Sequence, residues 1–165
     1  PLKAALEKDS SLNVSGATNF VFEECAIKNS FGVDCEDKTS FSYAYVTADG
    51  IENGGEFSGM GWSVARFLKD FNPASAGVEA VENALKSRNG TTIEPGKYEI
   101  VFGHYAAADV VEHVLAGAFS LGAVDAGVSF LAPHLEQEVA SQELSIVDDG
   151  TLEHSVAAKQ VDDED

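Results

Sequence analysis

The chain has 165 residues, 44% of them hydrophobic, so it can bury one sizeable core or two small ones. Its 28 acidic and 10 basic residues give a formal net charge of −18, which would repel nucleic acid and anionic lipid surfaces. Such a charge fits either a well-solvated surface, suited to a salty cytoplasm, or the attraction of basic peptides. No apolar run long enough for a membrane span and no secretory leader occurs, so we expect a cytoplasmic protein. The start at Pro1 and the acidic ending 162–165 are typical of a piece of a longer protein.

The first third of the chain predicts a helix followed by a hairpin. Residues 1–9 have apolar positions at helical spacing and are interpreted as the end of a truncated helix. Residues 18–49 are rich in aromatic and β-branched residues around "NSFG", which predicts two antiparallel strands joined by a tight turn. A three-residue turn centred on Ser30 would place Cys25 opposite Cys35 or one position off. Two cysteines are too few for a disulfide framework, so we expect free thiols.

The middle of the chain predicts a glycine-rich turn and two helices. Segment 49–62 has no GxxxxGK[ST] or GxGxxG motif, so its glycines indicate a hairpin turn and strand flexibility rather than a phosphate loop. Residues 63–72 are predicted to form a short helix and residues 74–90 a longer one. The apolar stripe of the longer helix consists of Val78, Val81, Ala84 and Leu85.

The second half predicts strand, helix and strand. "PGKYEIVFG" contains a predicted strand at Tyr98–Phe102, and "ELSIVDDGTL" a strand that ends in an acidic turn. The fold class is therefore α+β, an antiparallel hairpin or sheet with packing helices followed by a strand-helix-strand portion. We predict a subdomain at 1–72 and a helix-strand-helix-strand portion at 73–165, or one continuous domain.

The predicted helix in "AAADVVEHVLAGAFSLG", residues 106–122, carries the polar residues Asp109, Glu112 and His113. A glutamate beside a histidine on a helix invites comparison with zinc peptidases, in which a histidine ligand and a glutamate base share one face. Asp109 and His113 are four residues apart and can pair. The alternatives are a solvated or packed polar face and a displaced metal site.

Several segments occur in an order that resembles the TldD/PmbA family, once described as modulators of DNA gyrase, over residues 12–164. The segments are "IKNSFG", "TSFSYAYVTADG", "EAVENAL", "PGKYEIVFGHYAAADVVEH", "GVSFLAP", "VASQELSIVDDGT" and "VDDE". The resemblance implies the central portion of a longer protein. In that family TldD and its partner TldE (PmbA) form a complex that processes peptides and unfolded chains.

The resemblance also bears on the predicted helix in residues 106–122. The TldD side of the family carries a His-Glu-x-x-x-His motif there, and counting back from "VDDG" places its three positions on Glu112, His113 and Gly117. Glycine has no side chain to bind a metal. The resemblance therefore implies a PmbA/TldE-type subunit with no catalytic residue and no metal of its own, and with zinc possible in the partner subunit.

Other candidate residues carry weaker signals. His104, His134 and His154 form no spaced pair with a cysteine, and the Asp148–Asp149 pair could bind a cation but is more typical of a turn. If this portion of the family lines a peptide cleft, the strand "QELSIVDDG" and the connection "AGVSFLAP" are the best contributors, because a strand edge can accept an extended peptide. The candidate peptide-binding residues are Ser129, Phe130, Leu144, Ile146 and Asp148.

Three functions remain open from the sequence. The first is a non-catalytic PmbA/TldE-like subunit of a peptide-processing metalloprotease complex, which shapes a peptide cleft and subunit contacts. The second is an active zinc metallopeptidase whose ligands lie outside this portion, and the third is an acidic cytosolic binding domain unrelated to proteolysis. The expected partners are a TldD-like subunit or a second copy of the full-length protein, and a peptide or unfolded protein, with no nucleic acid and no membrane.

Overall fold

The computed structural model describes residues 1–158. They form two compact units, Pro1–Thr92 together with the described residues from Asp148 onward (unit 1) and Ile93–Val147 (unit 2). Unit 1 combines a three-stranded antiparallel sheet with helices, which confirms the predicted α+β class. Its elements are α1 (Leu2–Lys8), β1 (Asn13–Lys28), β2 (Asp34–Glu52), β3 (Gly55–Ala65), the 3-10 turn η1 (Leu68–Asp70) and α2 (Pro73–Ser87).

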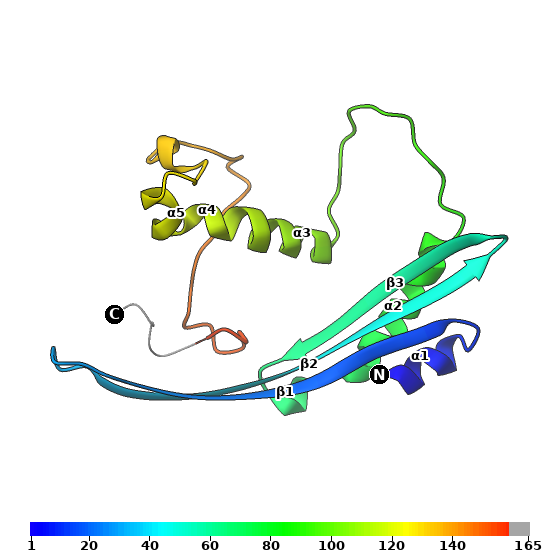
Figure 1. Ribbon diagram of the computed structural model, residues 1–165, viewed down its shortest axis with the longest axis horizontal. Coiled ribbons are helices and arrows are strands. Elements are labelled where there is room, and N and C mark those ends of the chain that lie inside the picture. Colours follow the sequence, from blue (N-terminus) through cyan, green and yellow to red (C-terminus); the bar gives the residue numbers. More distant parts are fainter. Residues whose placement is uncertain (159–165) are drawn as a thin grey trace. The chain divides into compact units, whose positions relative to one another are not determined.

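The strands lie in the order β1-β2-β3, each antiparallel to its neighbour. The predicted hairpin around "NSFG" is confirmed, because β1 and β2 pair from Asn13 with Asp49 to Lys28 with Asp34. β3 pairs with β2 only from Ser42 onward. The distal half of the β1-β2 hairpin therefore continues past β3 as a two-stranded ribbon, visible on the left of Figure 1.

The predicted register at the hairpin tip is wrong by two residues. Cys25 lies opposite Asp37, whereas Cys35 lies opposite Ile27. The turn is wider than expected because Asn29 closes it: its amide donates to the carbonyl of Val33 (3.1 Å), and its side-chain oxygen accepts from the Val33 amide (3.2 Å). An asparagine that bonds the backbone ahead of it stabilises such a turn. Both cysteines are free thiols, as expected.

The glycine-rich segment contains the second hairpin turn, at Asn53 and Gly54, whose φ values are +51° and +82°. Two positive φ angles between paired strands are typical of a type I′ turn, which confirms the turn prediction. Further along β3, Gly59 and Gly61 serve close packing instead. A Cβ at either position would overlap the backbone of α2.

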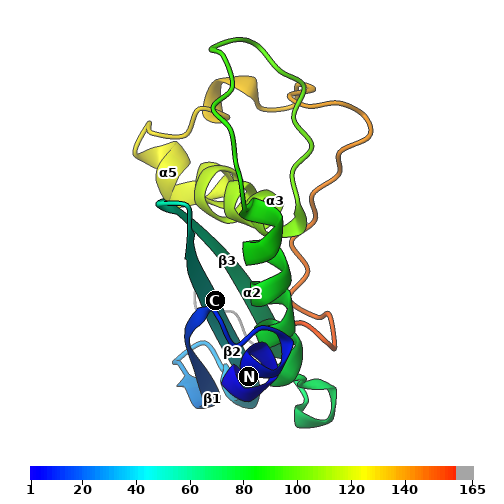
Figure 2. The ribbon, with the colours of Figure 1, turned by 90° about the vertical axis from the view of Figure 1, so that its right-hand side faces the viewer.

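Helix α2 confirms the predicted helix of residues 74–90 and packs along one face of the sheet (Figure 2). Pro73 begins the helix, where a proline costs no hydrogen bond. The side chains at one-turn spacing, Ala76, Ala80 and Ala84, are fully buried, and small residues on both surfaces let helix and sheet approach closely. The core consists of Ala5, Leu12, Val46, Ala48, Phe57, Ala76, Ala80, Val81 and Ala84.

The short helix predicted at residues 63–72 is wrong. β3 continues through Ala65, which pairs with Ser42, and only Leu68–Asp70 forms a single 3-10 turn. Ser63, Val64 and Ala65 all pair with β2, so strand pairing overrides the local helical tendency.

Unit 2 consists of α3 (His104–Val110), the π-helical turn η2 (Val111–Ala116), α4 (Gly117–Phe119), α5 (Leu121–Asp125) and the 3-10 turn η3 (Ala132–His134). The strands predicted at Tyr98–Phe102 and in residues 143–149 are not formed. Val101 is 97% exposed, and no described strand lies beside either segment, so their backbone groups have no ladder to join. Within residues 1–158, no helix combines the length and apolar character needed to cross a bilayer.

Candidate functional site

The helical run from His104 to Phe119 carries the three motif positions. Its backbone stays in the right-handed helical region through Val111 and Gly117, so α3, η2 and α4 follow one another without a break. Glu112, His113 and Gly117 are all exposed. In place of the predicted side-chain pairing of His113 with Asp109, the structure has a backbone contact, in which His113 Nδ1 lies 3.2 Å from the Asp109 carbonyl oxygen and can donate to it.

The π-helical turn changes which residues share a side of this helix. In an α-helix, residues five apart lie about 140° apart around the axis, too far to bind one metal ion together. In η2 the backbone hydrogen bonds span five residues, which brings residues five apart onto one side of the helix, much as i and i+4 share a side of an α-helix. The first and last motif positions, Glu112 and Gly117, have this spacing. A Cβ added at Gly117 would meet no atom within 4 Å, so the position is open but has no ligand.

The residues of this helix do not fit a catalytic zinc ion. Such a site takes three protein ligands and leaves one position for water. Glu112 and His113 are adjacent, so their side chains leave the helix in different directions. Among the residues that the structure describes, no cluster of three histidine, cysteine or acidic side chains is placed to hold a metal ion. We therefore derive no catalytic step through zinc in this chain.

Ser129 and Phe130, two of the candidate peptide-binding residues, lie after α5. Ser129 is buried, and its hydroxyl donates to the Ala118 carbonyl (2.6 Å) and accepts from the Leu131 amide (3.2 Å). These bonds give Ser129 a structural role in tying the loop to α4. Phe130 is 55% exposed and available for contact.

The other three candidates lie in an irregular extended segment instead of a strand. Leu144, Ile146 and Asp148 are exposed, and their segment lacks a neighbouring strand in the described chain. The acidic turn that follows is formed by Asp149, whose carboxylate accepts from both the amide (2.9 Å) and the hydroxyl (2.6 Å) of Thr151. The two bonds hold the pKa of Asp149 below its usual range, the hydroxyl bond being the larger cause.

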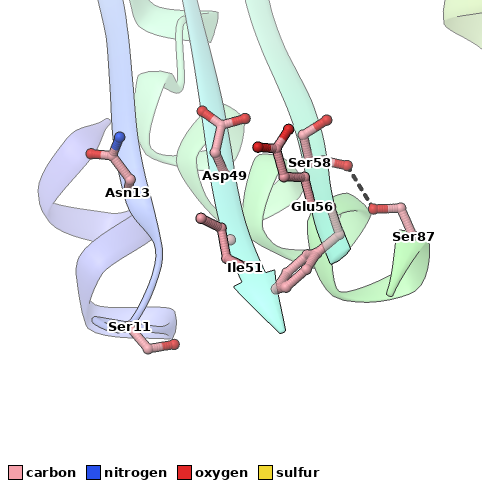
Figure 3. Close-up of a pocket in the computed structure, with 9 residues that line it drawn as sticks. Ser11, Asn13, Asp49, Ile51, Glu56, Ser58 and Ser87 are labelled. Atoms are coloured by element: carbon pink, nitrogen blue, oxygen red, sulfur yellow. Dashed lines mark hydrogen bonds between the residues drawn. The ribbon is translucent and has the colours of Figure 1, made fainter. Parts of the chain in front are cut away.

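Sequence reasoning missed a cavity of about 820 Å³ at the open end of the sheet, beside the β2-β3 turn (Figure 3). It is lined by Ser11, Asn13, Asp49, Gly50, Ile51, Glu56, Phe57, Ser58 and Ser87. Asp49 lies on β2 and Glu56 on β3, and the glycine-rich turn joins these two strands. The predicted turn is therefore the sequence signal from which their proximity could have been inferred. Carboxylates and hydroxyls of this kind can bind a cationic or amide group.

Comparisons with known proteins agree with this architecture. The family model for the PmbA/TldA metallopeptidase central domain matches residues 2–88, and that for the C-terminal domain of the same family matches residues 95–164. An uncharacterized protein of Methanocaldococcus jannaschii is 26% identical over 156 residues, which is 94% of this chain and 36% of that protein.

Two solved structures share the fold. A protein of Thermotoga maritima, provisionally named a modulator of a DNA gyrase, has a TM-score of 0.68 and 24% identity over 82% of this chain and 32% of its own. A protein of Bacteroides thetaiotaomicron with a similar provisional name has a TM-score of 0.66 and 19% identity over 85% of this chain and 33% of its own. The chain thus spans about a third of the length of the relatives it matches.

Proposed function

The chain belongs to the PmbA/TldA metallopeptidase family, and we propose that it is part of a non-catalytic, PmbA/TldE-type subunit of a peptide-processing complex. Metallopeptidase-related ancestry follows from the family. The subunit role is our own inference, and the single observation that carries it is Gly117, which stands where the motif implied by the resemblance needs its second histidine.

The geometry around Gly117 supports this proposal. The π-helical turn brings positions five residues apart onto one side of the helix, as a five-residue ligand spacing needs, while Gly117 supplies no ligand. Loss of a side chain on an otherwise suitable scaffold is consistent with a subunit that keeps the helix and leaves zinc chemistry to a partner. In this proposal the chain contributes to a peptide cleft and to subunit contacts in the cytoplasm.

Zinc titration of this chain tests the proposal. We expect no tight site by calorimetry, because one carboxylate and one diverging imidazole cannot complete a zinc shell. Stoichiometric tight binding that His113→Ala abolishes would overturn it. Zinc analysis of the longer parent, purified alone, separates our proposal from the alternative in which the parent is itself a zinc peptidase with ligands outside this chain.

Peptide contact needs a separate test on the assembled complex. We propose that residues 126–133 and 142–150 contact the substrate through Phe130, Leu144 and Ile146, which are between 43% and 55% exposed. The charge of −18 favours basic peptides, with an attraction that salt weakens. Hydrogen exchange with an unfolded basic substrate should show new protection in both segments. Unchanged exchange there removes these residues from substrate contact, and failure to co-purify with a TldD-like subunit argues against the proposed subunit role.

A further inference from the structure

Residues 148–158, the last that the structure describes, belong to unit 1, although the whole of unit 2 separates them in sequence from its sheet. They form neither a helix nor a strand. Short turns order them instead, in which the Ser155 amide donates to the Leu152 carbonyl (2.9 Å) and the Ala158 amide to the Ser155 carbonyl (3.3 Å). Isolated turns of this kind have little stability of their own, so the position of the segment depends on its contacts with the rest of unit 1.

Arg66, which directly follows β3, supplies the first of these contacts. Its guanidinium Nη1 donates to the carbonyls of Ser155 (3.1 Å) and Ala158 (2.8 Å), and the contact is partly buried. Hydrogen bonds from a charged donor are stronger than neutral ones, and Ala158 is buried beside this one. Both acceptors are backbone oxygens. The contact therefore depends on the arginine and on the path of the segment, and not on the side chains of the segment.

A ring contact at the next residue, Phe67, attaches the same segment. Phe67 meets His154 edge to face, with ring centroids 5.4 Å apart and ring planes at 80°. This is a favourable geometry for two aromatic rings. The adjacent residues Arg66 and Phe67 thus hold the stretch from His154 to Ala158 at both of its ends.

The segment covers a cavity of about 510 Å³ in unit 1. One wall comes from β2 and from the residues after β3, and the other wall comes from the segment itself. The lining residues are Asp37, Lys38, Arg66 and Phe67 on the first wall and Gly150, Thr151, Glu153 and Ala158 on the second. Movement of the segment would remove the second wall and would uncover the guanidinium of Arg66.

We propose that residues 149–158 are a reversible strap, which Arg66 and Phe67 close over this cavity. Few contacts hold the closed state, namely two bonds from one guanidinium nitrogen and one ring contact. Segments held in this way open locally at a much lower free energy than a core strand does. The strap therefore gates access to the cavity and to Arg66 while the sheet stays folded.

Hydrogen exchange of the whole chain tests the closed state. The amides of Ser155, Ala157 and Ala158 bond within the strap, at 2.9, 3.2 and 3.3 Å, and report its order. In the unmodified chain they should exchange more slowly than free amides and faster than the amides of β2. Arg66→Ala should speed their exchange at least about tenfold, the factor that loss of one bond from a charged donor supplies. Cleavage after Glu153 by a glutamate-specific protease should accelerate in parallel.

Two further variants separate strap opening from damage to the sheet. His154→Ala changes the strap alone and should speed the same exchange about threefold, which corresponds to the loss of one aromatic contact. Lys69→Ala is the matched control, because it removes a cation 5.4 Å from the centre of the Phe67 ring and leaves both bonds of Arg66 in place. Three results overturn the proposal: strap amides as slow as those of β2 or as fast as free amides, exchange that neither Arg66→Ala nor His154→Ala accelerates, or equal acceleration by Lys69→Ala.

Discussion

Replacing Gly59 by alanine should force α2 away from the sheet. The added Cβ would overlap the backbone of Ala80 and Ala84 and would lie 2.6 Å from the carbonyl carbon of Asn83, where an ordinary contact is 3.4 Å or more. The helix must therefore move by at least about 0.8 Å along this line. A gap of that size forfeits a quarter to a half of the dispersion energy of the affected contacts.

The expected cost follows from what α2 buries. Ala76, Ala80, Val81 and Ala84 are fully buried, so the displaced surface is the centre of the core. Overpacking usually costs about 1–3 kcal/mol, and the entropy gained by removing a glycine returns about 0.4–1 kcal/mol. Because the added Cβ would strike backbone atoms and not a flexible side chain, the cost falls at the upper end of that range, and we expect a net loss of about 2 kcal/mol in the free energy of unfolding.

Urea unfolding followed by Trp62 fluorescence measures this loss, since Trp62 is the single tryptophan and lies in β3. Gly55→Ala in the same strand is the matched control, because a Cβ there meets only the Glu52 carbonyl, at 3.5 Å. We expect the control to stay within about 0.5 kcal/mol of the unmodified chain, as is usual for surface substitutions. A Gly59→Ala variant as stable as the control would refute the close-packing argument.

Three further results are expected. Asn83→Ala should lower the free energy of unfolding by about 1 kcal/mol, the usual worth of one hydrogen bond, and should increase aggregation in light scattering because it uncovers the Met60 carbonyl on the β3 edge. Thr151→Ala should raise the pKa of Asp149 toward its usual value, which an NMR titration measures. In the unmodified chain the bonds from Thr151 stabilise the folded turn at any pH above the usual aspartate pKa. This stabilisation is lost as the pH falls through the lowered pKa. Rebuilding His-Glu-x-x-x-His at the three motif positions should strengthen zinc binding at least tenfold in calorimetry, and the same variant with Gly117 retained should show no such gain.

The parts of the fold that the sequence predicted correctly are those with local causes. The β1-β2 hairpin follows from alternating residues around a turn, and α2 follows from an apolar stripe after Pro73. The register at the hairpin tip was wrong because the side chain of Asn29 widens the turn, a detail that depends on one hydrogen-bond geometry.

The two strands predicted in the second half failed for a different reason. Residues 98–102 and 143–149 have the composition of strands, but a strand forms only beside a partner, and composition does not reveal which segment that is. The same limit applies to the cavity near Asp49 and Glu56, which depends on β2-β3 pairing. The π-helical turn at Val111–Ala116 likewise has no proline or other local signal that would have predicted it.

In the helical run from His104 to Phe119, an amphipathic sequence pattern does not lead to burial of the apolar side chains. Its apolar side chains at helical spacing stay largely in solvent: Val111, Val114 and Phe119 are 43%, 49% and 56% exposed, whereas Ala118 is buried. Each exposed apolar side chain forgoes part of the roughly 1.5–3 kcal/mol that full burial provides. The amphipathic pattern of a helix therefore predicts which of its side chains are apolar, whereas their burial depends on a second surface, which a pattern within one helix does not reveal.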